Sequence, residues 1–209
     1  MAEKSKKKSI SDIILKVSWL SVLLGIGMEL LILGIAFGFQ TPVTSKGVTA
    51  DLVNKVSWST IVCIGLTIAT AATKLKHRFM GLAGLIAAPI AFHIAKFLQE
   101  STALALSLAL PLAAGPSPIL ITIIKGVEYG TLGYLLGKLS MNRDFSLKKH
   151  VLSGLAVGSV FGGLLVYLNV SMALNPVPMA AIVSKSVNEI IFPVGCSLVL
   201  LTAQRLGEK

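Results

Sequence analysis

Charged side chains are scarce in this 209-residue sequence, of which Asp, Glu, Lys and Arg make up only 13%. Soluble domains carry roughly 25% of these residues, whereas 54% of this chain is hydrophobic. Several apolar runs approach the roughly 20 residues that a helix needs to cross a bilayer. The composition therefore excludes an ordinary soluble domain and predicts an all-α integral membrane protein.

Acidic residues are the rarer charge, with nine Asp and Glu against nineteen Lys and Arg and a formal net charge of +10. Such a charge can indicate nucleic-acid binding. Here, however, the basic residues flank apolar segments, which is typical of membrane topology. We therefore expect the lipid bilayer as a partner, and no nucleic acid.

Cysteines and catalytic motifs are also scarce. The two cysteines, Cys63 and Cys196, fall inside apolar runs with no Cys or His at ligand spacing, so we expect packing residues rather than a disulfide framework or a metal site. The sequence has no H-E-x-x-H, G-x-S-x-G, Walker A or haem-attachment motif. We therefore predict no catalytic residues, no metal, no cofactor and no enzymatic activity.

Six apolar runs are candidate membrane spans. They predict a bundle of six transmembrane helices arranged as three up-down hairpins, at Val17–Phe39, Val56–Thr73, Phe79–Leu98, Ile119–Leu139, Val151–Tyr167 and Ile182–Ala203. Residues 17–203 would form a single transmembrane domain between a basic cytoplasmic tail, residues 1–16, and a cytoplasmic C-terminal tail, residues 204–209.

The segment around 101–118 is apolar but interrupted by three prolines. Its uninterrupted part is too short to cross a bilayer at 1.5 Å per helical residue. We predict an interfacial or re-entrant segment on the outer side. The polar stretch between the first two spans is predicted to be an outer loop.

Polar groups recur at one depth of the predicted spans. Counting helical rise from the cytoplasmic ends places them in the outer half of the bundle. Because intramembrane ionisable residues usually face a bundle interior or a cavity, we predict a ligand-binding or intramembrane polar cluster made of Glu29, His93, Lys96, Lys125, Glu128, Lys185, Asn188 and Glu189. Within it, Lys125 is spaced to pair with Glu128, and Lys185 with Glu189.

A weak internal repeat accompanies this cluster. Each returning helix carries a lysine near its start, Lys55, Lys125 or Lys185, with Trp58, Glu128 or Asn188 three residues later. Chance similarity among membrane helices is the alternative. For Lys55, Lys96 and Lys185 we also expect snorkelling to the interface, and for Trp58 a place in the outer aromatic belt.

Glycines give the fifth span a small-xxx-small pattern at Gly154, Gly158 and Gly162. Such a pattern predicts close packing against a neighbouring helix, or self-association or contact with other membrane subunits.

The outline of six helices, a basic cytoplasmic face and an outer polar cluster resembles the substrate-binding component of vitamin-type energy-coupling uptake systems. The resemblance is one of outline, and no site residue follows from it. The leading hypothesis is an inner-membrane transport protein that binds a small solute, with an anion as one candidate, in an outer-half cavity. The alternatives are an oligomeric ion channel and a non-catalytic membrane assembly or partner-binding protein.

The distribution of basic residues predicts that both termini are cytoplasmic, because fourteen Lys and Arg fall on the predicted inner side and five on the outer side. A fluorescent protein fused after Lys209 should fluoresce, and alkaline phosphatase fused there should be inactive. The same reporters fused after Val43, between the first two spans, should give the reverse result. Active phosphatase after Lys209 would contradict the predicted orientation.

Overall fold

The computed structural model describes residues 10–69, 76–109, 115–142 and 145–208, and within these ranges the chain contains no strand. The helices are α1 (Ile10–Gly38), α2 (Ser45–Ala69), α3 (Lys76–Ala105), α4 (Pro118–Met141), α5 (Leu147–Val157), the π-helical turn η1 (Gly158–Gly162), α6 (Gly163–Ser171) and α7 (Met179–Glu208). Since α5, η1 and α6 are continuous, they form one span.

Within the described residues, six helical segments are long and apolar enough to span a membrane, as the sequence predicts. Their outward faces are apolar. On α1, the side chains of Leu15, Trp19, Leu23 and Leu30 are between 61% and 67% exposed. Apolar side chains spread over the outside of a helical bundle are suited to contact with lipid rather than water.

The helices extend further than hydropathy alone predicts. The predicted outer loop after the first span is largely helical, because α2 begins at Ser45 rather than at Val56. Thr44 precedes this helix, and its Oγ1 accepts a hydrogen bond from the backbone N–H of Gly47 at 3.2 Å. Such capping starts a helix in polar sequence, where a search for apolar runs detects nothing.

The segment around 101–118 is divided between two helices and their connection. Its first five residues are the end of α3, and Pro118 is the first residue of α4. Residues 110–114 lie outside the described ranges. The interfacial or re-entrant segment therefore stays a prediction for the residues in between.

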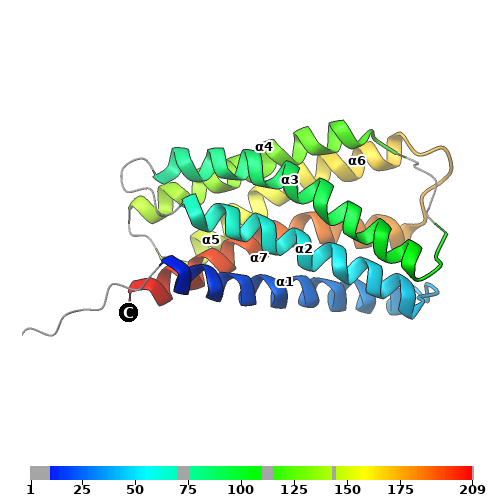
Figure 1. Ribbon diagram of the computed structural model, residues 1–209. Helices are drawn as coiled ribbons and strands as arrows, with labels where there is room; N and C mark the ends of the chain where they lie inside the picture. The colour runs from blue at the N-terminus through cyan, green and yellow to red at the C-terminus, as the bar shows by residue number, and fades with distance from the viewer. Residues whose placement is uncertain (1–9, 70–75, 110–114, 143–144, 209) are drawn as a thin grey trace, which may run out of the picture.

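The helices lie side by side along a common long axis, with the start of α1 and the C-terminus at the same end of the bundle (Figure 1). Each span packs against the next along α1, α2, α3 and α4, while α7 packs against both α5 and α1. The spans α4 and α7 are the most buried. The starts of α2, α4 and α7 lie together at the opposite end, so their early turns share one half of the bundle.

Glycines let neighbouring helices approach closely. A Cβ on Gly84 of α3 would lie 2.0 Å from the carbonyl oxygen of Tyr129 on α4, which no real side chain tolerates. The glycine face of the fifth span packs in the same way against α7 of the same chain, with Gly158 against Ile190 and Gly162 against Glu189. The predicted small-residue contact thus lies within the chain.

The two cysteines, separated by 133 residues in sequence, meet in the core. Cys63 of α2 and Cys196 of α7 are both fully buried, and their Sγ atoms are 3.4 Å apart. Both pack in the hydrophobic core, as predicted from the sequence, but their proximity is set by the contact between α2 and α7.

This proximity makes the contact between α2 and α7 directly testable. Iodine, which partitions into membranes, should oxidise the two thiols to a disulfide while it is itself reduced to iodide, with release of two protons. The tryptic fragments that contain Cys63 and Cys196 should then stay joined until a reductant is added. Cys196→Ser should abolish the cross-link. Two free thiols persisting in the oxidised, folded protein would contradict the helix arrangement.

Candidate functional site

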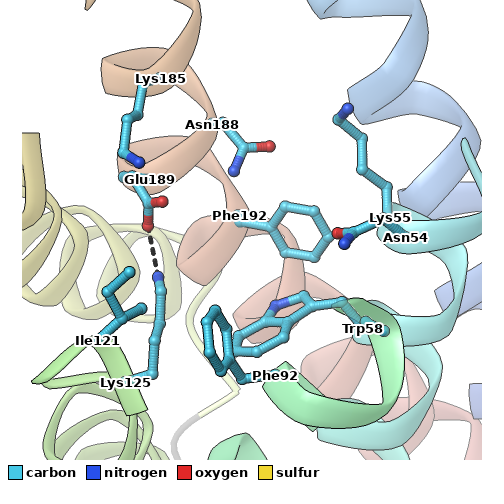
Figure 2. A pocket seen from close by; sticks show the side chains of 11 residues that line it. Asn54, Lys55, Trp58, Phe92, Ile121, Lys125, Lys185, Asn188, Glu189 and Phe192 are labelled. Atoms are coloured by element: carbon cyan, nitrogen blue, oxygen red, sulfur yellow. Dashed lines mark hydrogen bonds and ion pairs between the residues drawn. The ribbon is translucent and has the colours of Figure 1, made fainter. Parts of the chain in front are cut away.

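A cavity of about 160 Å³ lies between α2, α3, α4 and α7. It is lined by Asn54, Lys55 and Trp58 of α2, Phe92 and Ala95 of α3, Ile121 and Lys125 of α4, and Lys185, Asn188, Glu189 and Phe192 of α7. Figure 2 shows the aromatic rings gathered on one side, with Lys185 and Asn188 on the other. The volume is below the roughly 300 Å³ of the smallest drug-sized pockets, so the cavity suits a small molecule.

Lys125 links two helices through two carboxylates. Its Nζ donates to Oε2 of Glu128, one turn further along α4, at 2.8 Å, and also to Oε2 of Glu189 on α7. Figure 2 shows the Lys125 side chain directed from α4 toward Glu189. All three residues are buried, and Glu128 is completely so. We refer to these three residues as the lysine–glutamate cluster.

Aromatic rings complete the surroundings of Lys125. Its Nζ lies 5.5 Å from the ring centroid of Trp58 and 5.7 Å from that of Tyr129. The two rings pack edge-to-face, with centroids 5.5 Å apart. Because a cation over a π-face is stabilised most where water is excluded, these rings help to hold the lysine charged inside the bundle.

The other two repeat lysines differ in their pairing. Nζ of Lys55 donates to Oε2 of Glu29 on α1 at 2.6 Å, so this pair is locally neutral. Lys185 lines the cavity, yet no carboxylate of the described residues lies within 4 Å of its Nζ. The predicted pair between Lys185 and Glu189 is absent, because the Glu189 carboxylate turns to Lys125 of a different helix.

Amide side chains add further polar groups to the cavity wall. Asn54 Nδ2 donates to Gln99 Oε1 at 2.8 Å, and Gln99 Nε2 donates to Asp51 Oδ1 at 2.6 Å, which fixes Asn54 against α3. Asn188 Oδ1 is buried and accepts no hydrogen bond from any described residue. A buried acceptor without a donor is costly, and one that lines a cavity is available to a ligand.

The structure brings six of the eight predicted cluster residues into or beside the cavity. Lys125, Lys185, Asn188 and Glu189 line it, while Glu128 and Glu29 pair with lysines that line it. Two lie elsewhere. His93 is exposed on α3 and shares a 3.1 Å hydrogen bond with Thr122. Lys96 is paired with Glu100 at 3.7 Å, and the side chains of this pair are 41% and 47% exposed, respectively.

Two further interpretations made from sequence are wrong. Trp58, expected in the outer aromatic belt, is only 8% exposed and lines the cavity. Lys55, expected to snorkel to the interface, is paired inside the bundle with Glu29. The lysine repeat is the sequence feature that relates Lys55 and Trp58 to the cavity. Its three lysines, Lys55, Lys125 and Lys185, all line the same cavity, and Trp58 follows Lys55 by three residues.

Other lining residues carry no polar signal in the sequence. Phe92, Ile121 and Phe192 are apolar residues of the predicted spans, and their side-chain type does not distinguish them from lipid-facing neighbours. Only the rotation of each helix about its own axis brings them to the cavity.

No protein-family model, no curated protein and no solved structure matches the chain. The interpretation of the site therefore depends on its own residues.

Removal of Lys125 should strongly destabilise the bundle. Lys125→Ala leaves two buried carboxylates without their cation, and breaking a buried ion pair from one side costs about 3–5 kcal/mol. The free energy of unfolding, measured by reversible titration with a denaturing detergent, should fall by this amount. Lys96→Ala, which removes an exposed lysine, should change it by less than about 1 kcal/mol. Equal effects of the two substitutions would contradict a central role for Lys125.

Proposed function

We propose that the chain is a membrane transport protein whose cavity between α2, α3, α4 and α7 binds a small organic anion. In this proposal the six spans form three hairpins with both termini in the cytoplasm, and the cavity lies in the outer half of the bundle. The observation that carries the proposal is Lys185, a lysine on the cavity wall with no carboxylate within 4 Å in the part of the chain described.

The charge of the expected ligand follows from the pairing around the cavity. Each of the three nearby carboxylates already accepts from a lysine, Glu29 from Lys55 and the other two from Lys125. A cationic ligand would compete with these lysines, whereas an anionic group finds an unpaired ammonium at Lys185. Charge-assisted hydrogen bonds of this kind are about twice as strong as neutral ones.

The body of the expected ligand follows from the opposite side of the cavity. Trp58, Phe92 and Phe192 present aromatic surface there (Figure 2). Ligand sites typically combine such apolar lining with a few placed polar groups. A small monocarboxylate with an apolar or aromatic body combines both features.

Three ligands of similar shape test the predicted charge. Benzoate should raise the thermal unfolding temperature of the purified full-length protein, whereas neutral benzyl alcohol and cationic benzylamine should not. In Lys185→Gln the affinity for benzoate should fall about 10- to 100-fold, because a hydrogen bond to a charged group contributes roughly 1.5–3 kcal/mol. Uptake of labelled benzoate into vesicles that contain the protein should fall in parallel.

Lys96→Gln is the matched control, because Lys96 is also on an outer turn but does not line the cavity. It should bind benzoate as the unsubstituted protein does. If neither benzoate nor smaller or larger monocarboxylates stabilise the protein, the proposed function is wrong, and a structural role of the charges in holding the bundle together becomes the better explanation. Single-channel conductance in planar bilayers would instead favour an ion channel.

A further inference from the structure

The lysine–glutamate cluster contains one cation and two carboxylates. If all three groups are ionised, the cluster carries a net charge of −1 inside an apolar bundle. The neighbouring pair of Lys55 and Glu29 is neutral and compensates none of it. An uncompensated charge at membrane depth is expensive, so the cluster needs a positive charge, which a nearby basic group or a bound proton can supply.

Glu128 is the least solvated carboxylate of the cluster. Its side chain is 0% exposed, and its Oε1 is buried with no hydrogen-bond donor among the residues described. Glu189 is slightly more accessible, with an exposed fraction of 11% for its side chain. Glu189 is also held in place, because Gly162 of the π-helical turn packs against its Cβ and backbone. Such π-helical turns are frequent at functional sites.

The titratable groups around the cluster leave one candidate for the missing positive charge. Tyr129 packs beside Lys125 and is neutral in its ordinary protonated form, as is the thiol of Cys196 further along α7. Lys185 lies one turn before Glu189 on α7 and lines the same cavity without a carboxylate partner. In the absence of a solute, Lys185 therefore balances the charge of the cluster from the neighbouring turn of α7.

An anion bound at Lys185 removes this balance. The charge of Lys185 is then compensated by the solute, and the −1 of the cluster is left without a counter-charge. Two carboxylates that share one site in low dielectric favour a single shared proton under these conditions. The proton neutralises the cluster, and the solute and proton together add no net charge to the bundle.

We propose that binding of one organic anion at Lys185 is coupled to uptake of one proton by Glu128, which makes the protein an anion–proton cotransporter. This inference rests on the proposed function for the identity of the anion. Coupling between two ligands is reciprocal, so protonation of Glu128 also strengthens anion binding. The affinity for the anion should rise about tenfold for each unit of decrease in pH over the range in which Glu128 titrates.

The first experiment requires no solute. Lys185→Gln removes the same positive charge that a bound anion compensates, so the cluster of this variant should hold a proton at neutral pH. Infrared spectroscopy of the full-length protein should then show the carbonyl stretch of a protonated carboxylic acid, shifted in heavy water. The band should be absent from Lys96→Gln. The infrared band should disappear in the double variant that combines Lys185→Gln with Glu128→Gln. If that double variant does not fold, the combination of Lys185→Gln with Glu189→Gln should remove the band instead.

The second experiment uses benzoate as the probe. Calorimetric titration in two buffers of different ionisation enthalpy should show about one proton taken up per benzoate bound. Glu128→Gln should bind benzoate with no proton uptake, while Glu100→Gln, an exposed carboxylate on α3, should behave as the unsubstituted protein does.

The outcomes separate the two proposals. Benzoate binding without proton uptake overturns the coupling and leaves the proposed function intact. Failure of benzoate and of smaller and larger monocarboxylates to bind, together with a Glu128-dependent infrared band in Lys185→Gln, overturns the proposed function and supports the proton site. Absence of that band in folded Lys185→Gln overturns the proton site itself.

Discussion

The contact on which the site depends is the bridge from Lys125 of α4 to Glu128 on the same helix and Glu189 on α7. In an apolar bundle these groups have few other partners, so their pairing links α4 to α7 at this depth. The rings of Trp58 and Tyr129 then pack around the lysine. Once this geometry is set, Lys185, one turn earlier on α7, is left facing the cavity without a carboxylate.

Close helix packing makes this bridge possible. Gly162 admits the backbone of α7 at Glu189, and Gly84 admits that of α4 at Tyr129. In lipid, where helices gain little from burying apolar surface against each other, such small-residue contacts and interhelical polar bonds drive association. The cavity therefore lies where two closely packed helix pairs, α3 with α4 and the fifth span with α7, meet α2.

Hydropathy predicts which residues cross the bilayer, but it does not predict helix ends. The six spans are detectable because each is a run of apolar side chains, yet α2 begins eleven residues before its apolar run. The helices α4 and α7 also begin before their predicted spans, at Pro118 and Met179, so their lysines lie deeper in the helices than the sequence predicts. Lys125 and Lys185 are seven and six residues from the starts of their helices, beyond the first turn where the helix macrodipole disfavours a cation. Their retention is explained by the carboxylates and the cavity instead.

The sequence by itself determined the helical class of the protein and its six apolar segments of spanning length, because these depend on composition and on the helical rise per residue. It also gave Lys125 and Glu128 as a pair, since residues three apart share a helix face. Only the tertiary structure decided that Glu189 pairs with Lys125 rather than with Lys185, that Cys63 meets Cys196, and that Trp58 faces inward. These contacts join different helices, and the rotation of one helix relative to another is set by packing across the whole bundle rather than by any local stretch of sequence.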